Sequence, residues 1–259
     1  IEYYFGKDFD ELPDLDPMCL SISTKQGIVL AGLSDKDLKN TLARDFAVPV
    51  NMLEATQGNN KKHWLPVIRK ELNQLVRTET FRIVKTAAVP RGRRVISGKM
   101  VLAVKRGQSG RITKLKARFV AHGFRQQFGK DYHATFAPTV HKSSLRLLLS
   151  LGVRNKWLLK QFDVKGAFLL SDLQYNIFLR PPKIVAKLLN MREDEVWELQ
   201  KTLYGLKQSA NRWHADFTKE MIRLGFKRCP EDHCLFRRSD RRGELIVGVH
   251  VDDSVCVSS

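Results

Sequence analysis

Cysteine is scarce in this chain of 259 residues, which contains four, and none of them forms a C-x-x-C pair. The sequence therefore indicates neither a disulfide framework nor a paired-cysteine zinc motif. The segment C-P-E-D-H-C, from Cys229 to Cys234, contains residue types that bind metals, but no second cluster completes a four-ligand set. We expect reduced thiols in an intracellular protein.

Long apolar runs are also missing. No run approaches the roughly 20 residues that cross a bilayer, and the acidic start of the chain lacks the apolar core of a signal peptide. We therefore expect no membrane partner. The chain begins without Met and stops just past a pair of aspartates, so we expect a piece of a longer polypeptide.

Acidic residues are few beside the basic ones, with 27 Asp and Glu against 45 Lys and Arg and a formal net charge of +18. This excess favours a polyanionic partner, of which nucleic acid is the commonest. The alternative is a basic protein with no nucleic-acid role. A hydrophobic content of 43% indicates a globular chain, long enough for one large domain or two lobes.

The last 16 residues have the pattern of a β-hairpin. Residues 245–251 predict one strand and residues 254–257 the start of the next, with Asp252 and Asp253 at the tip between them. Because Asp suits tight turns, a solvated turn is one interpretation of this pair. A site that binds cations is the other.

A second apolar strand upstream also ends in a carboxylate. W-L-L-K-Q-F-D-V-K-G, from Trp157, brings Asp163 to the rim of a sheet, where it could meet Asp252 and Asp253 if the strands are neighbours. Three carboxylates at one point repel each other unless a cation neutralises them, and Mg2+ prefers such oxygen ligands. Two ions roughly 4 Å apart would clamp the attacking and leaving oxygens of a phosphoryl transfer.

The segment from Arg82 to Val120 alternates apolar and charged residues and predicts an antiparallel ribbon with a turn at residues 107–110. One face would pack on the core, and the other would be basic. An anionic ligand such as nucleic acid or a triphosphate would fit that face, although a solvated basic face explains it equally well. The basic residues are Lys99, Lys105, Arg106, Lys114, Lys116 and Arg118.

Helices and further strands are predicted around these segments. Residues 61–79 and 209–224 carry apolar stripes at helical spacing, and Ser209 is the expected N-cap of the second helix. A Leu-rich helix is expected from Ser143, which would be its N-cap. Residues 177–180 and 196–199 predict short strands. A short helix from Leu33 to Phe46 is possible within residues 1–60, which otherwise read as a linker or a poorly patterned segment.

Four segments, in this order, resemble the copia-type (Pseudoviridae-like) retrotransposon reverse transcriptases. They are L-K-A-R-F-V-A-H-G-F-R-Q-Q-F-G-K-D-Y-H-A-T-F-A-P-T-V (115–140), Q-F-D-V-K-G-A-F-L (161–169), L-Y-G-L-K-Q-S (203–209) and V-H-V-D-D (249–253). The resemblance runs from about Trp64 to the C-terminus. It implies an α+β right-hand polymerase, with fingers and palm in residues 61–259, an antiparallel palm sheet packed on helices, and no thumb within this chain.

The resemblance also implies roles for individual residues. Asp163, Asp252 and Asp253 would be the catalytic aspartates and would bind two Mg2+ ions, for which Mn2+ can substitute. Other positions would contact the incoming nucleotide: Phe168 would block a ribose 2′-OH, and the basic ribbon and the loop after Leu203 would supply the rest. The nucleotide-binding residues are Lys105, Arg118, Phe168, Gly205, Lys207 and Gln208. For the loop residues, a plain turn is the alternative.

The implied function is RNA-directed DNA polymerase activity of a retrotransposon polyprotein, with an RNA or DNA template, a primer and deoxynucleoside triphosphates as partners. The implied location is intracellular, in a cytoplasmic virus-like particle or the nucleus. The sequence departs from the family pattern, which has Tyr at His250, Trp at Met100, Pro at Ala210 and Asn-Gly within the stretch F-L-L-S-D-L (168–173). These departures and the missing thumb leave an alternative: an inactive remnant that binds nucleic acid by charge alone.

Overall fold

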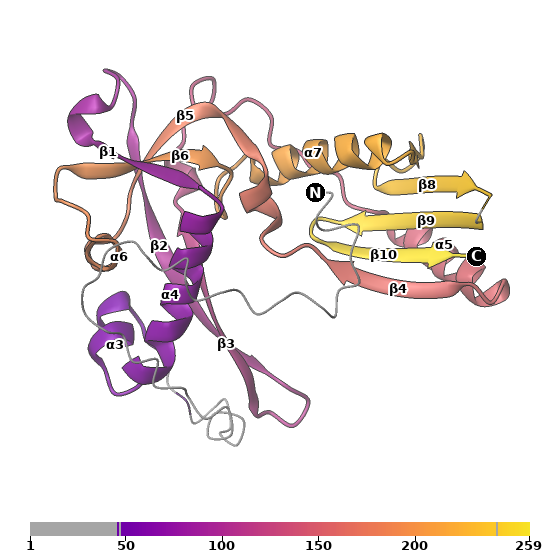
Figure 1. Ribbon diagram of the computed structural model, residues 1–259, viewed down its shortest axis with the longest axis horizontal. Coiled ribbons are helices and arrows are strands. Elements are labelled where there is room, and N and C mark those ends of the chain that lie inside the picture. The colour runs from indigo at the N-terminus through magenta and orange to yellow at the C-terminus, as the bar shows by residue number, and fades with distance from the viewer. Residues whose placement is uncertain (1–45, 47, 242) are drawn as a thin grey trace.

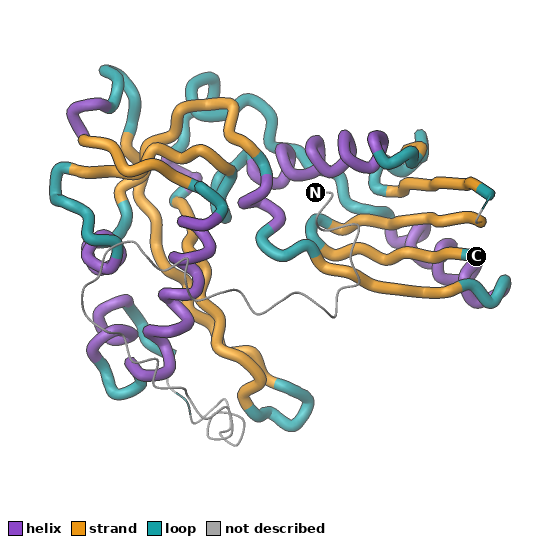
Figure 2. Tube along the Cα trace, in the orientation of Figure 1, coloured by secondary structure: helices purple, strands orange, loops and turns teal. Residues whose placement is uncertain are grey.

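The computed structural model describes residues 46, 48–241 and 243–259, and they form two five-stranded sheets with a few helices (Figure 1; Figure 2). This is the mixed α+β class that the sequence predicts. The helix predicted over residues 33–46 lies outside the described residues, apart from Phe46. The helices are α3 (Met52–Gln57), α4 (Lys61–Arg77), α5 (Lys142–Arg154), α6 (Lys183–Leu188) and α7 (Ser209–Arg223), with short 3-10 turns η3 (Thr86–Ala88), η4 (Gly123–Arg125) and η5 (Ala167–Leu170).

The first sheet has the order β1-β6-β5-β2-β3 and contains the long basic ribbon. Its strands are β1 (Phe81–Lys85), β2 (Val95–Arg106), β3 (Ile112–Ala121), β5 (Asp172–Arg180) and β6 (Glu195–Lys201). The β2–β3 hairpin is antiparallel from Gly98 opposite Ala121 to Arg106 opposite Ile112, as predicted. The prediction that residues 82–85 join this ribbon is wrong, because β1 pairs with β6 at the far edge.

The core of the first sheet forms where α4 packs on β3. The predicted stripe of α4 is buried, with Trp64, Ile68 and Leu75 fully enclosed. Trp197 of β6 stacks on Phe81 with ring centroids 4.0 Å apart. The buried face of the ribbon thus fixes β2 and β3 to a rigid support, and their other face is left for solvent or a ligand.

The folded region begins before residue 61. Asn51 caps α3 through its side chain, and Met52 and Ala55 of this helix are buried. Phe46 is also buried, with its ring centroid 5.7 Å from that of His63. Part of the segment that we expected to be a linker therefore belongs to the core.

The second sheet is antiparallel throughout, with the order β4-β10-β9-β8-β7. Its strands are β4 (Leu158–Asp163), β7 (Lys227–Arg228), β8 (Leu235–Asp240), β9 (Gly243–His250) and β10 (Asp253–Ser258). Trp213, Phe217 and Met221 of α7 form a core with Val247 and Val249 of β9. The helix α5 contacts β4, β9 and β10, so the sheet has helical support (Figure 1).

The predicted helix caps are wrong. The N-cap residues of α5 and α7 are His141 and Gln208, and neither side chain accepts a capping hydrogen bond. Ser209 instead directs its hydroxyl to the carbonyl oxygen of Leu203 at 2.6 Å, which tightens the loop before α7. Gly225, at φ +84°, ends α7 as predicted.

Among the described residues, none of the helices combines the length and the apolar character that crossing a membrane demands.

Candidate active site

The β9–β10 hairpin brings two aspartates to one end of the second sheet. His250 ends β9 and is the Cα partner of Asp253, so Val251 and Asp252 form a two-residue loop. Asp163, the last residue of β4, is also a Cα partner of Asp253. Because opposed residues on antiparallel strands have Cα atoms about 5 Å apart, the backbone brings Asp163 and Asp253 together from distant parts of the sequence.

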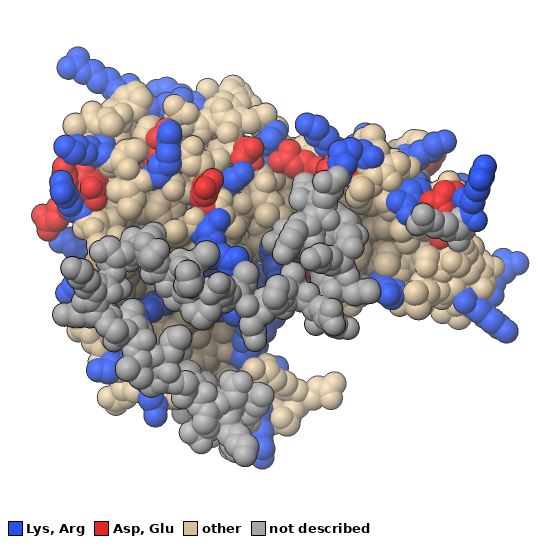
Figure 3. Space-filling model, in the orientation of Figure 1, with Lys and Arg blue, Asp and Glu red and all other residues tan. Residues whose placement is uncertain are grey.

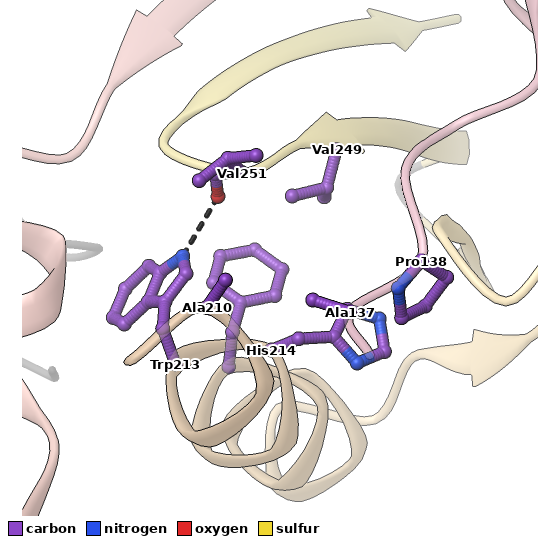
Figure 4. Close-up of a pocket in the computed structure, with 8 residues that line it drawn as sticks. Ala137, Pro138, Ala210, Trp213, His214, Val249 and Val251 are labelled. Atoms are coloured by element: carbon purple, nitrogen blue, oxygen red, sulfur yellow. Dashed lines mark hydrogen bonds between the residues drawn. The ribbon is translucent and has the colours of Figure 1, made fainter. Parts of the chain in front are cut away.

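Asp252 is held by hydrogen bonds on both sides. The indole Nε1 of Trp213 donates to the carbonyl oxygen of Val251 at 2.7 Å (Figure 4), and the backbone N–H of Val164 donates to the carbonyl oxygen of Asp252 at 3.0 Å. The two peptide groups that flank the Asp252 Cα are therefore tied to α7 and to the residue after Asp163. Neither contact could be predicted from the sequence, since both join distant segments.

The loop conformation is strained at Val251. Its φ is +63°, whereas Asp252 is not among the residues with positive φ. A type II′ hairpin turn requires this pattern and usually has Gly at the first loop position. A β-branched residue there is an outlier that costs on the order of 1–3 kcal/mol and persists only where its surroundings enforce it.

The three aspartate side chains, as they stand, are not gathered around a common point. In the part of the chain that the structure describes, no group of three or more His, Cys, Asp or Glu side chains is arranged to hold a metal ion. The donor chemistry nevertheless fits a divalent cation. Asp163, Asp252 and Asp253 supply carboxylate oxygens at adjoining backbone positions, and side-chain rotation about staggered torsions can turn them towards one another.

Tyr204 lies at the centre of the site, and the sequence reasoning missed it. The guanidinium of Arg118 lies 4.7 Å from the centroid of its ring, and the Phe168 ring contacts it edge-on at 5.0 Å. Burial raises the pKa of Tyr204, Arg118 opposes that rise, and the nearby charges of Asp252 and Asp163 add to it. One aromatic ring thus connects the basic ribbon to the aspartates. Its position beside Gly205 in L-Y-G-L-K-Q was the available signal.

The open face of the ribbon is basic, as predicted. Lys105 pairs with Lys114, and Lys116 and Arg118 follow at alternate positions of β3, so the four side chains share one face. The pKa of Lys116 is lowered by burial first and then by Arg118 and Lys105, while Asp163 acts in the opposite direction. The charge of Lys116 is therefore close enough to Asp163 for the two to attract each other.

Glu71 of α4 lies behind this face. Its carboxylate accepts a hydrogen bond from the backbone N–H of Phe119 at 3.0 Å. Burial raises its pKa, while that hydrogen bond and the charges of Arg118 and Lys116 lower it in part. The Glu71 side chain thus anchors the middle of β3 and offers a partly buried negative charge to the cations beside it.

The loop of residues 203–208 is fixed by its own backbone and by buried amides. Gly205 has φ +88°, and a Cβ there would lie 2.2 Å from the carbonyl oxygen of Ala121. Gln208 is buried, and its side-chain amide bonds Gln126 and the backbone of Asp131, both at 3.0 Å. Lys207 is exposed, with its Nζ 5.5 Å from the centroid of the Tyr132 ring.

The connector between the two sheets exposes large aromatic rings. Phe124, Phe128 and Phe136 are 75%, 71% and 78% exposed. The Phe128 ring contacts those of Tyr132 and His133, with centroids 5.7 and 5.6 Å apart. Aromatic rings this exposed are unusual on the surface of a soluble protein and typical of a surface that binds a partner.

Basic side chains are spread over the face that Figure 3 displays. Several arginines lie near the aromatic connector. Arg93 donates to the carbonyl oxygen of Lys130 at 2.8 Å and to Asp131 at 3.4 Å. These contacts tie the connector to the start of β2 and keep positive charge beside the exposed rings.

The cysteines of the described residues form no metal site. Cys229, Cys234 and Cys256 are free, and the Cys234 sulfur lies 3.7 Å from Nε2 of His214. Burial raises the pKa of Cys234 to about 11, so its thiol is protonated at neutral pH. Reduced thiols stay a prediction for these residues.

Comparison with known proteins agrees with this arrangement. Residues 78–259 match the family described as reverse transcriptase (RNA-dependent DNA polymerase), and the chain belongs to this family. The retrovirus-related Pol polyprotein from transposon RE1 of Arabidopsis thaliana is 29% identical over 224 residues, covering 86% of the chain and 15% of that protein. The retrovirus-related Pol polyprotein from transposon TNT 1-94 of Nicotiana tabacum is 31% identical over 219 residues, covering 83% of the chain and 16% of that protein.

A polyprotein from yeast is similar to the chain to about the same extent. The transposon Ty1-NL1 Gag-Pol polyprotein of Saccharomyces cerevisiae is 29% identical over 234 residues, covering 89% of the chain and 12% of that protein. The chain is thus a reverse transcriptase domain of the copia and Ty1 retrotransposon type. It spans about 15% of the length of the curated relatives it matches.

Proposed function

We propose that this chain forms the fingers and palm of an RNA-directed DNA polymerase that transfers a deoxynucleotide to a primer 3′-OH. In this proposal the first sheet with α4 is the fingers, and the second sheet with α5 and α7 is the palm. The proposed polymerase region comprises residues 61–259 together with the helix α3, which precedes them. The observation that carries the proposal is the opposition of Asp163 and Asp253 beside the Asp252 loop.

The three aspartates would hold the divalent cations that the family uses. Asp163, Asp252 and Asp253 offer the oxygen ligands that Mg2+ prefers, and Mn2+ could take its place. When bound, two such ions would neutralise the triphosphate and activate the attacking hydroxyl. The chain's own part is to hold the three carboxylates at the strand ends, where a primer terminus and a nucleotide can meet.

The basic face of the ribbon would bind the triphosphate. Lys105 and Arg118 would contact its oxygens, and Lys116, whose charge is attracted by Asp163, would add a third cation to this face. Guanidinium and ammonium groups fixed on a strand pair stabilise negative charge that develops during transfer without having to reorganise. This preorganisation is what the rigid support beneath β2 and β3 provides.

The aromatic rings would shape the sugar and base positions. Phe168, held edge-on against Tyr204, would close the space that a ribose 2′-OH would need. Lys207 is exposed, with its Nζ over the Tyr132 ring, and would approach the template or nucleotide phosphates. Gly205 and Gln208 would hold the loop in shape, since the Gln208 side-chain amide already bonds Gln126 and the backbone of Asp131.

A template of RNA or DNA would be read by base pairing, so the protein would recognise backbone and shape. Its high positive charge supports such a partner. The corresponding location is a cytoplasmic virus-like particle, with access to the nucleus. The template and the location are both inferred for this chain from the family to which it belongs.

Primer extension on an RNA template tests the proposal. The 259-residue chain should incorporate deoxynucleotides in the presence of Mg2+, and Asp252→Asn should lower the rate by at least about a hundredfold because it removes a charge at the reacting centre. Asp194→Asn, at an exposed aspartate in the turn before β6, is the matched control and should retain the wild-type rate. Unchanged extension by Asp252→Asn would refute the assignment.

A second candidate function is binding of nucleic acid by charge without catalysis. The absence of a gathered carboxylate cluster in the described residues favours it. It predicts binding with a steep dependence on salt and no incorporation at any concentration of Mg2+ or Mn2+. Measured incorporation by the wild-type chain, abolished by Asp252→Asn, would exclude it.

A further inference from the structure

We propose that Trp213 is a positioning residue for Asp252: its indole N–H holds the Val251 peptide in the left-handed turn that aims the Asp252 carboxylate. The inference rests on the proposed polymerase function. Trp213 lies on α7 within the core of the second sheet, and its polar contact is with the backbone of Val251. Its effect would pass through one backbone carbonyl.

The geometry of the hydrogen bond supports this role. The carbonyl oxygen of Val251 belongs to the peptide plane that ends at the Asp252 Cα, and that plane is rigid. A 2.7 Å bond from Trp213 Nε1 therefore limits rotation of the unit that precedes the Asp252 Cα. On the other side, Val164 N–H binds the Asp252 carbonyl oxygen at 3.0 Å. These two bonds fix the backbone on both sides of the Asp252 Cα, and so the direction in which its Cα–Cβ bond leaves the loop.

The donor itself is immobile. Trp213 is 2% exposed and packs against Phe217, with ring centroids 5.6 Å apart and the planes tilted. Figure 4 shows its indole turned towards the hairpin loop, with Val249 and Val251 above α7. A ring held by a helix core can transmit the position of α7 to the loop, as a solvent-exposed donor could not.

The loop needs such a bond because Val251 is unsuited to its conformation. A positive φ at a β-branched residue is unfavourable, so the loop would relax towards other turn geometries without an external restraint. Relaxation would move Asp252 away from Asp163, and small misplacements of reacting groups are costly in rate. The positive φ and the hydrogen bond from Trp213 both belong to Val251, so a substitution at Val251 can remove the strain while the bond is kept or lost.

Trp213→Phe removes the N–H and keeps the aromatic volume. We expect kcat for primer extension to fall by about 10- to 100-fold, with a higher Mg2+ concentration needed for half-maximal rate and little change in the nucleotide KM. Trp64→Phe is the matched control, because Trp64 is fully buried and its Nε1 has no hydrogen-bond partner among the described residues. It should leave kcat and the Mg2+ requirement unchanged.

Val251→Gly provides the rescue. Glycine adopts positive φ without strain, so the loop would no longer depend on the indole. In the Val251→Gly background, Trp213→Phe should reduce kcat by less than about threefold, a non-additivity typical of groups that act on each other. Equal losses in both backgrounds, or a Trp213→Phe enzyme as active as Trp64→Phe, would overturn the proposal.

Hydrogen–deuterium exchange separates this inference from the proposed function. Trp213→Phe should speed exchange of the amides at residues 251–254, and Trp64→Phe should not, whether or not the chain extends a primer. A wild-type chain without any extension would refute the polymerase assignment, and the exchange data would then decide the role of Trp213 alone. Identical exchange in the wild type and Trp213→Phe would refute that role.

Discussion

Asp163 and Asp253 face each other across neighbouring antiparallel strands at the end of the second sheet. Like charges in directly opposed positions destabilise a strand pair by up to roughly 1 kcal/mol. A sequence selected only for stability would avoid this pairing. Its presence beside a strained loop at Val251 is typical of a functional site that reduces the stability of the fold.

Asp253→Asn should therefore stabilise the chain when no divalent cation is present. We expect Tm in EDTA to rise by up to about 4 °C, because one of the two opposed charges is removed. Saturating Mg2+ should raise Tm of the wild type and have a smaller effect on the variant, since ligands stabilise the state that binds them. Differential scanning calorimetry with and without Mg2+ measures both shifts.

The control for that experiment is Asp194→Asn, which removes an exposed charge from the turn before β6. It should change Tm little and preserve the response to Mg2+. If Asp253→Asn lowered Tm in EDTA, repulsion between the two carboxylates would not be a feature of the folded state. If Mg2+ stabilised wild type and Asp253→Asn equally, Asp253 would not bind the ion.

Local patterns predicted much of the fold. Alternation along β2 and β3 is a property of neighbouring residues, and it gave both the ribbon and its basic face. The apolar stripe of α7, ended by Gly225, and the β9–β10 hairpin followed from the same kind of signal. The helix starts were less certain because a serine near a boundary can bond elsewhere, as Ser209 does.

The rest depends on contacts between distant segments. The pairing of β1 with β6, rather than with the ribbon, is decided by packing of Phe81 on Trp197. Tyr204 and Trp213 read as an ordinary loop residue and an ordinary core residue until the fold brings them to Arg118 and to Val251. No spacing rule within the sequence contains that information.

Gly205→Ala should disrupt the loop that carries Tyr204. A Cβ would lie 2.2 Å from the carbonyl oxygen of Ala121, and φ is +88°, so backbone must move in addition to the strain at a left-handed residue. We expect a loss of more than about 2 kcal/mol in the free energy of unfolding, measured by urea denaturation. Loss of primer extension should accompany it.

Gly92→Ala separates the clash from the strain. Gly92 has φ +82°, and a Cβ there meets no atom within 4 Å. It should cost about 1 kcal/mol from backbone conformation alone. Equal destabilisation by the two substitutions would mean that the approach of Gly205 to β3 contributes nothing.

Glu71→Gln should stabilise the chain at neutral pH. The pKa of Glu71 is raised by burial, so the folded state binds a proton more tightly than the unfolded state, and stability falls as pH rises from the ordinary value of 4.5 through the raised pKa. Glutamine keeps an acceptor for the Phe119 N–H and carries no charge. The variant should be more stable than wild type above that window and equal to it below pH 4.5.

Urea denaturation from pH 4 to pH 8 measures the two profiles, with Glu193→Gln, an exposed glutamate, as the control. The control should run parallel to wild type across the range. A Glu71→Gln variant that was less stable than wild type at neutral pH would indicate that attraction to Arg118 and Lys116 outweighs the cost of burial. The direction of the pKa shift would then be wrong.

Phe128→Ala should weaken binding of single-stranded RNA. The Phe128 ring is 71% exposed within a basic connector, and stacking of a base on such a ring is worth about 1–3 kcal/mol. We expect Kd for an oligouridine, measured by fluorescence anisotropy, to rise by about 5- to 100-fold. Leu147→Ala is the control, because Leu147 is an apolar residue of α5 that is 61% exposed, and it should leave Kd unchanged.

The salt dependence distinguishes stacking from charge in this surface. Phe128→Ala should shift the plot of log K against log salt without changing its slope, because no phosphate contact is lost. Arg125→Gln, at an exposed arginine of the same connector, should reduce the slope by about 0.7 if it contacts one phosphate of a single strand. An altered slope in Phe128→Ala, or an unchanged Kd, would contradict a stacking role and leave the exposed phenylalanines without a nucleic-acid partner.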